Sequence, residues 1–206
     1  MRTTAIIPAY NEESRVGITV HAVSAFVDEI LVINDGSQDN TAKAAKLAGA
    51  RVIHQPSNLG YISAIKRGFR EAGGDVVVTI DADGEIPADK IPDLLQPILS
   101  GKADMVQGRR NFIPRPSERI LTYLANKKAP VGDSGTGFRA LKTDLAEKLS
   151  LGGVCICGIF SLEVIRNKGK IVEIDIQLNK IDKPRRIAWY HIRQFFYLLP
   201  WLLKRY

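Results

Sequence analysis

The stretch Val-Val-Val-Thr-Ile-Asp-Ala-Asp-Gly-Glu, residues 76–85, joins an apolar run directly to a group of acids. Its first five residues are rich in β-branched side chains, which is typical of a strand buried on both faces. Because such a strand cannot carry Asp81 and Asp83 inside itself, we expect these carboxylates at its C-terminal end, where open α/β sheets bind ligands. Glu85 adds a third acid, and an all-oxygen set suits Mg²⁺ or Mn²⁺. The spacing alone leaves two interpretations, a metal site for a phosphorylated substrate or a solvated turn.

Strand and helix patterns alternate on both sides of this stretch. Apolar runs predict strands at residues 3–7, 29–33, 51–54, 75–80, 103–107 and 170–178. Helical patterns and capping residues predict helices at residues 12–26, 41–49, 61–72, 88–99, 118–126, 141–149 and 159–167. We expect Pro8 to stop the first strand. This order predicts a single α/β domain with a mostly parallel central sheet and helices on both of its faces.

Length and composition fit one globular domain of 206 residues, with no secretory signal predicted at the N-terminus. Cys155 and Cys157 are the only cysteines in the sequence. Two such close neighbours are poor disulfide partners and too few for a zinc site, so we expect packed, reduced thiols in a cytoplasmic protein.

Charge is distributed unevenly along the chain. Residues 1–103 contain 10 Lys or Arg and 13 Asp or Glu, a net charge of −3, whereas residues 104–206 contain 19 and 9, a net charge of +10. This asymmetry indicates that the second half meets an anion, such as a phosphorylated substrate, a membrane surface or nucleic acid, or is a solvated basic surface.

The C-terminal residues 188–206 form an aromatic and basic segment, which we separate from a main domain at residues 1–187. The apolar run inside the segment is far shorter than the roughly 20 residues that span a bilayer. Aromatic side chains interleaved with basic ones fit a helix lying on a membrane surface. The alternative is a helix packed on the sheet or on a second subunit.

Four segments in order resemble the family-two glycosyltransferases: AIIPAYNEE at 5–13, VINDGSQDNT at 32–41, DAD at 81–83 and DSGTGFR at 133–139. The last segment is similar to the later motif of the branch that makes dolichyl- and polyprenyl-phosphate sugars, although its two glycines loosen that motif. The resemblance extends over about residues 3–178. It implies the nucleotide-diphospho-sugar transferase fold, called GT-A, and an inverting single displacement.

The same resemblance implies roles for individual residues. The nucleotide-sugar group would be Pro8, Tyr10, Glu12, Asp35 and Asp81, and the metal group Asp81, Asp83 and Glu85. Glu85 stands where relatives often carry Gln, so the metal site would be more anionic here. The implied cofactor is Mg²⁺ or Mn²⁺.

The acceptor side is inferred from charge. Transfer to a hydroxyl needs a general base, whereas a phosphate monoester, with a second pKa of about 6, is already an anionic nucleophile. It needs cationic positioning, which arginine supplies through bidentate contacts. The candidates are the arginines at 109, 110, 115, 119 and 139, with Arg109 as the first choice. The predicted acceptor-phosphate group is Arg109, Arg119, Ser134 and Arg139, and the predicted catalytic residues are Asp83, Arg109 and Arg139.

The resulting hypothesis is a metal-dependent inverting transferase that is peripheral on the cytoplasmic face of the membrane. It moves mannose or glucose from GDP-mannose or UDP-glucose to dolichyl or polyprenyl phosphate. One alternative is a soluble family-two transferase that glycosylates a sugar or protein hydroxyl, with Asp133 or Glu163 as the base. Another is a non-catalytic nucleotide-sugar binding module. No motif supports nucleic acid as a partner.

Overall fold

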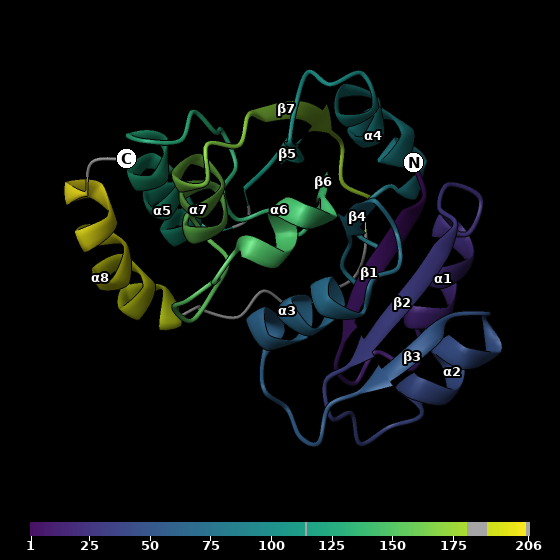
Figure 1. Cartoon of the computed structure of the whole chain (residues 1–206). Coiled ribbons are helices and arrows are strands. Elements are labelled where there is room, and N and C mark those ends of the chain that lie inside the picture. The colour runs from purple at the N-terminus through teal and green to yellow at the C-terminus, as the bar shows by residue number, and fades with distance from the viewer. Residues whose placement is uncertain (114, 181–188, 205–206) are drawn as a thin grey trace.

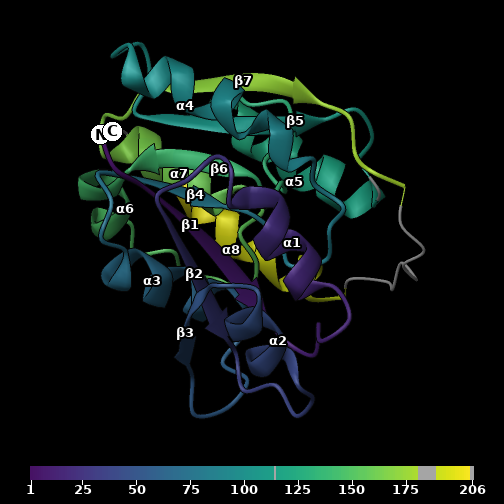
Figure 2. The same cartoon turned by 90° about the vertical axis from the view of Figure 1, so that its right-hand side faces the viewer.

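The computed structural model describes residues 1–113, 115–180 and 189–204. These residues form a seven-stranded sheet in the order β3-β2-β1-β4-β6-β5-β7 (Figures 1 and 2). The strands are β1 (Thr3–Ala9), β2 (Glu29–Asn34), β3 (Arg51–His54), β4 (Val76–Thr79), β5 (Met105–Arg110), β6 (Arg139–Lys142) and β7 (Ile171–Ile176). Neighbouring strands pair in parallel except at β6, which is antiparallel to both β4 and β5. The predicted mostly parallel sheet is confirmed.

Helices cover both faces of this sheet, as predicted. They are α1 (Val16–Val23), α2 (Thr41–Leu47), α3 (Tyr61–Glu71), η1 (Ala88–Lys90), α4 (Ile91–Leu99), α5 (Pro116–Asn126), α6 (Thr143–Lys148), α7 (Ile159–Arg166) and α8 (Tyr190–Leu203). Alternate strand residues serve opposite cores, because successive side chains of a strand point to opposite faces. Ala5 and Ile7 of β1 join the core under α1, α2 and α4, whereas Ile6 joins the core under α3, α6 and α7.

A third, smaller core joins α8 to the rest of the domain. Leu198 and Trp201 of α8 pack with Leu121 of α5 and Leu162 of α7. Figure 1 shows α8 beside α5, at the end of the molecule opposite β3. No helix in the described part of the chain has the length and apolarity needed to cross a membrane. The boundary expected between residues 187 and 188 lies outside the described residues.

Two predicted boundaries of secondary-structure elements were wrong. Strand β1 continues through Pro8, which pairs with Ile33 of β2. The pairing of β1 with β4 ends at Ile6, so Pro8 has a strand on one side only, and an edge position tolerates its missing N–H. The helix predicted at 141–149 is present as α6 but begins only at Thr143, because residues 139–142 form strand β6 and pair with strands far away in the sequence.

The strand order places a ligand crevice at one point of the sheet. Strand β1 has β2 on one side and β4 on the other. The chain builds β2 and β3 on the first side and then crosses to the other side of β1 to form β4. Such a switch point leaves room between loops at the C-terminal strand ends, and ligands bind there in open α/β sheets. The predicted polar residues after β1, β2 and β4 therefore share one edge.

Candidate active site

The predicted carboxylates lie together at this edge. Asp81, Asp83 and Glu85 follow β4 and line a pocket of about 310 Å³. Asp83 is only 6% exposed, and its Oδ1 accepts a 3.0 Å hydrogen bond from the Glu85 amide. The turn after the strand thus holds three carboxylates around one cavity. An all-oxygen set of this kind fits a hard divalent cation such as Mg²⁺ or Mn²⁺.

Gly137 faces these acids from the segment that leads into β6. Its carbonyl oxygen accepts a 2.8 Å hydrogen bond from Thr79 Oγ1, which fixes the segment against β4. A Cβ at this position would lie 2.5 Å from both carboxylate oxygens of Asp81. Any larger residue would therefore displace Asp81. Gly137 thus makes room for a carboxylate of the site.

A second hollow, of about 170 Å³, lies beyond the ends of β1 and β2. It is lined by Pro8, Tyr10, Asp35, Asn58, Gly60 and Tyr61, among others. Asp35 is buried and accepts hydrogen bonds from the amides of Leu59 (2.8 Å) and Gly60 (2.9 Å), which draws the loop after β3 to this edge. Glu12 does not line the hollow; its carboxylate lies 3.2 Å from Arg15 at the start of α1. Three predicted nucleotide-sugar residues thus lie together here, and Glu12 lies beside them.

Tyr61 links the two cavities, because it lines both of them. It is the first residue of α3, directly after the loop that Asp35 holds. Burial and the nearby charge of Asp81 raise the pKa of the Tyr61 phenol well above its ordinary value. The phenol is therefore neutral at physiological pH and can donate a hydrogen bond where the hollow opens into the carboxylate pocket.

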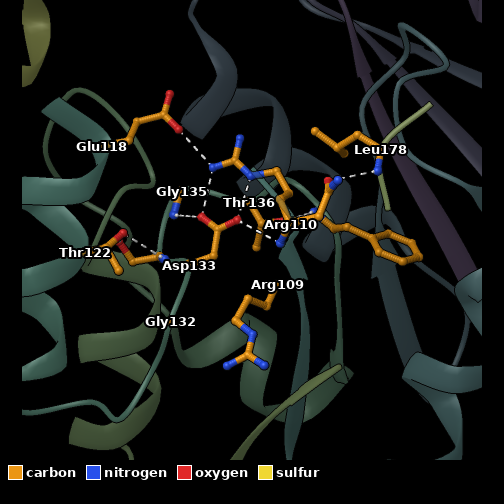
Figure 3. Close-up of polar contacts among 12 residues, drawn as sticks. Arg109, Arg110, Glu118, Thr122, Gly132, Asp133, Gly135, Thr136 and Leu178 are labelled. Carbon is orange, nitrogen blue, oxygen red and sulfur yellow. Dashed lines mark hydrogen bonds and ion pairs between the residues drawn. The ribbon is translucent and has the colours of Figure 1, made fainter. Parts of the chain in front are cut away.

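Arg110 is the arginine that the structure brings to the carboxylate pocket. Its Nε donates to Asp133 Oδ2 at 2.6 Å, and its Nη2 donates to Asp133 Oδ1 and Glu118 Oε2, each at 2.8 Å (Figure 3). Burial lowers the pKa of Arg110, but the hydrogen bonds and charges of the two acids outweigh it and raise the pKa above its ordinary value. Arg115, also in the pocket wall, donates to Glu118 Oε1 at 2.7 Å. Two arginines and two acids thus form a balanced, largely buried network.

The structure does not bring Arg109, the first choice from the sequence, into this pocket. Arg109 precedes Arg110 on β5, so the two side chains point in opposite directions (Figure 3). Arg109 pairs with exposed Asp175. The predicted strand ended at residue 107, whereas β5 continues to Arg110. Arg119 also lies elsewhere: it is exposed on α5, with its guanidinium 6.0 Å from the centre of the Phe112 ring.

Arg139 and Ser134 are buried behind the pocket rather than lining it. The Arg139 guanidinium stacks 4.5 Å from the centre of the Phe160 ring, and its Nη2 donates to the Ser134 carbonyl at 3.0 Å. Burial lowers the pKa of Arg139 from its ordinary value. The Ser134 hydroxyl lies 2.9 Å from the hydroxyl of Thr122 on α5. These contacts make both residues supports of the pocket wall.

The outer wall of the pocket contains residues that the sequence analysis did not select. Cys155 and Cys157 come from the loop before α7, and His191 comes from the start of α8. Gln194, one helical turn after His191, is fully buried and donates to the Cys157 carbonyl at 3.1 Å. A histidine and a glutamine three residues apart in an aromatic helix are the available sequence signal, because buried polar side chains require partners.

An apolar groove of about 410 Å³ adjoins this wall between α5 and α8. It is lined by Ser117, Ile120, Leu121, Trp189, His191, Ile192, Phe195 and Phe196. His191 lines both the groove and the carboxylate pocket. Trp189 is 70% exposed and Phe196 64% exposed, so the side of α8 that faces away from the third core is largely apolar.

The two carboxylates considered as bases for a hydroxyl acceptor lie outside the pocket lining. Asp133 is fully buried, and both of its oxygens accept hydrogen bonds from Arg110. Glu163 is 2% exposed on α7, and its Oε2 accepts from the Ser150 amide at 2.6 Å. Neither side chain can reach a substrate in the pocket without breaking these contacts.

Glycosyl transferase family 2 matches residues 4–165 of the chain. A polyprenol monophosphomannose synthase of Mycolicibacterium smegmatis is 31% identical, in an alignment that covers 85% of this chain and 76% of the relative. An undecaprenyl-phosphate mannosyltransferase of Micrococcus luteus is 28% identical, covering 91% and 81%. A dolichol-phosphate mannosyltransferase of Pyrococcus furiosus is 29% identical over 84% of this chain, which spans only 55% of that relative.

Solved structures have the same architecture. A glucosyl-3-phosphoglycerate synthase of Mycobacterium tuberculosis superposes with a TM-score of 0.75 at 25% identity, covering 89% of this chain and 73% of the other. A structure of that synthase with Mn²⁺, UDP-glucose and glycerol 3-phosphate gives a TM-score of 0.74 at 23% identity, with the same coverage. The predicted GT-A fold is confirmed, and so is the resemblance to the polyprenyl-phosphate branch. The family match covers β1 to α7 and every carboxylate of the pocket, so the chain belongs to glycosyl transferase family 2.

Proposed function

We propose that the chain transfers a hexose from a nucleotide diphosphate sugar to a polyprenyl phosphate. The observation that carries this proposal is the continuity of three sites. Tyr61 is shared by the hollow beyond β1 and β2 and the carboxylate pocket, and His191 is shared by that pocket and the apolar groove. The hollow suits a nucleotide, the carboxylate pocket suits a sugar diphosphate with its cation, and the apolar groove suits a lipid chain.

The donor end of this path suits a nucleotide sugar. The loop amides of Leu59 and Gly60 hold the Asp35 carboxylate in the wall of the hollow, where it can accept a hydrogen bond from a base or ribose. Asp81, Asp83 and Glu85 would hold Mg²⁺ or Mn²⁺ against the diphosphate. A divalent cation bound there stabilises the charge of the departing nucleoside diphosphate. Three relatives are named as mannosyltransferases or as a monophosphomannose synthase. We therefore propose GDP-mannose as the first donor to test and UDP-glucose as the second.

The acceptor end suits a phosphate rather than a hydroxyl. Arg110 and Arg115 line the pocket and present cationic groups to it. A phosphate monoester has a second pKa of about 6 and attacks as an anion without a protein base. The burial of Asp133 and Glu163 away from the pocket supports this assignment, because these two residues were the candidate bases for a hydroxyl acceptor.

The apolar groove suits the lipid part of the acceptor. Trp189, Ile192 and Phe196 are exposed along α8, and Ile120 is exposed on the facing side of α5. Basic Arg193 is exposed on the same helix, where it can meet anionic lipid headgroups. We propose that this surface rests on a membrane, so that the chain is peripheral to it; its position on the cytoplasmic face stays a prediction.

The test incubates the full chain with Mg²⁺ or Mn²⁺, a short polyprenyl phosphate and a panel of radiolabelled nucleotide sugars, and extracts the product into organic solvent. Transfer should require the phosphate, because the unphosphorylated polyprenol lacks an anionic nucleophile. Asp83→Asn should lower turnover about 100- to 1,000-fold by removing a charge that holds the metal and diphosphate. Asp89→Asn is the matched control, since Asp89 is exposed on η1 and does not line the pocket.

The outcomes separate the proposal from its rivals. Label that enters a water-soluble acceptor but never the organic phase would favour a transferase acting on hydroxyls. Binding of nucleotide sugar without transfer to any acceptor would favour a binding module. Equal turnover of Asp83→Asn and Asp89→Asn would remove the carboxylate pocket from the mechanism.

A further inference from the structure

Two thiols and an imidazole meet at the outer wall of the carboxylate pocket. One ligand atom from each of Cys155, Cys157 and His191 lies within 4.8 Å of the other two. Cys157 Sγ lies 3.8 Å from His191 Nε2. Cys157 and His191 are buried, Cys155 is half-buried, and all three line the pocket.

These distances are close to those of a tetrahedral zinc site. With Zn–S bonds of about 2.3 Å and a Zn–N bond of about 2.0 Å, neighbouring ligand atoms of a tetrahedron lie about 3.5–3.8 Å apart. The Cys157–His191 distance already has this value. The remaining separations exceed it by at most about 1 Å, which a side-chain rotation can supply.

Buried side chains hold the three groups in this arrangement. Ser117 Oγ lies 2.7 Å from His191 Nδ1, so it can accept a hydrogen bond from Nδ1–H and leave the Nε2 lone pair facing Cys157. Metal-binding histidines usually donate their other ring N–H to a neighbouring group in this way, which fixes the orientation of the ring. Gln194 Oε1 accepts hydrogen bonds from the amides of Val154 (3.0 Å) and Cys155 (3.3 Å), which ties the cysteine loop to α8.

Charge also favours a divalent cation at this place. Arg110 and Arg115, which line the same pocket, are paired with Asp133 and Glu118. The two arginines therefore add no net charge to the wall. A Zn²⁺ ion bound by two thiolates and a neutral imidazole is itself uncharged, so it avoids the cost of a buried net charge.

We propose that Cys155, Cys157 and His191 bind one Zn²⁺ ion that fastens α8 to the wall of the carboxylate pocket. Binding releases two protons, one from each thiol, and forms two Zn–S bonds and one Zn–N bond. The fourth position faces the pocket and takes water or a phosphate oxygen. Two cysteines alone are too few for a zinc site, but the fold supplies a third ligand, His191, from a helix 34 residues further along the chain. This site is distinct from the carboxylates, whose oxygens prefer Mg²⁺ or Mn²⁺.

Cobalt substitution tests the proposal without any activity measurement. The full chain is treated with a chelator in the presence of a reductant and titrated with Co²⁺. A thiolate-to-cobalt charge-transfer band should appear, saturate at one equivalent and disappear when Zn²⁺ is added. Asp83→Asn should keep this band unchanged, because carboxylate ligands give no sulfur-to-metal transition.

Variants of the three ligands and of their support complete the test. Cys157→Ser should abolish the band, and Cys155→Ser, at the more exposed position, should abolish it even if the first variant fails to fold. Ser117→Ala should lower zinc affinity about 10-fold through loss of imidazole orientation. Absence of the band in the wild-type chain, or its persistence in folded Cys155→Ser, would overturn the proposal.

Discussion

The two halves of the molecule reach the same pocket in different ways. In residues 1–103, the candidate residues lie at or shortly after the C-terminal ends of parallel strands, so a local rule brings them to one edge of the sheet. In residues 104–206, the pocket depends on an antiparallel insertion, β6, and on α8, which returns from the far end of the chain. The first half therefore builds its site from local structure, and the second half builds it from long-range packing.

The difference also appears in how charge is used. The carboxylates of the first half gather around one cavity, where their oxygens suit a divalent cation, and the pocket arginines of the second half pair with Glu118 and Asp133. A net charge of +10 thus says little about which cation faces the substrate. Adjacent Arg109 and Arg110 make this plain, since only Arg110 lines the pocket.

Substituting these two arginines tests the comparison most severely. Arg110→Ala leaves buried Asp133 without its ion-pair partner and leaves Glu118 with Arg115 alone, and breaking a buried pair costs about 3–5 kcal/mol of unfolding free energy. Arg109→Ala removes only an exposed pair and should cost at most about 1 kcal/mol. Urea unfolding of both variants measures the difference.

Lysine variants separate stability from binding at the same positions. Arg110→Lys keeps the charge but loses the bidentate fork, and should raise the KM for polyprenyl phosphate about 10-fold. Arg109→Lys should leave that KM unchanged. If the Arg109 variant shows the larger rise, the assignment of the acceptor phosphate to Arg110 is wrong.

Gly137→Ala tests whether the second half shapes the carboxylates of the first. The new Cβ would lie 2.5 Å from both oxygens of Asp81, so Asp81 must move. We expect about a 100-fold rise in the Mn²⁺ concentration that half-saturates transfer, because a ligand displaced by about 1 Å loses most of its bond. Gly17→Ala in α1 is the control: its Cβ would have no neighbour closer than 3.9 Å, and it should leave the metal requirement unchanged.

The outer face of α8 provides a third test, based on vesicle binding. Truncating the helix would strip Leu198 and Trp201 from the third core, so substitution is the cleaner change. Replacing Trp189, Ile192 and Phe196 by Ser should weaken binding to anionic vesicles at least about 10-fold, by removing apolar area that enters the interface. The control replaces exposed apolar residues of α1, α2 and α4, namely Ile18, Leu47 and Leu99. Equal losses in both variants, measured by sedimentation with vesicles, would contradict a specific membrane face.

The same contrast explains what the sequence could predict. Asp81 and Asp83 were predictable because a β-branched run and the acids after it are one local pattern. The orientation of Arg109 was not, because extending β5 to Arg110 changes which residues face each side, and the side chain alternates at every residue. Residues 139–142 carry no strand signal of their own, since their partners in β4 and β5 lie more than 30 residues away. The place of His191 in the pocket was not predictable for the same reason, since its neighbour Cys157 lies 34 residues earlier in the chain.

The last test concerns the opposite edge of the sheet, where the second half uses charge to hold itself together. Asp104 accepts a 2.7 Å hydrogen bond from Lys142 Nζ and a 2.9 Å bond from the Lys170 amide, which joins the antiparallel insertion to β7. Burial raises the pKa of Asp104, but these bonds and the two lysine charges outweigh it, so the pKa is lowered below 3.8. The stabilisation from Asp104 is therefore complete above its pKa in the unfolded chain and is lost as the pH falls through its pKa in the folded protein.

Asp104→Asn should lower the free energy of unfolding by about 1 kcal/mol at pH 7, discounted for partial exposure. The urea unfolding curves of the wild type and of this variant should converge in acid. Asp144→Asn, which removes an exposed carboxylate 3.7 Å from Lys148, should cost less than about 0.5 kcal/mol at pH 7. A gap between wild type and Asp104→Asn that widens as the pH falls would show that this carboxylate does not hold the insertion through its charge.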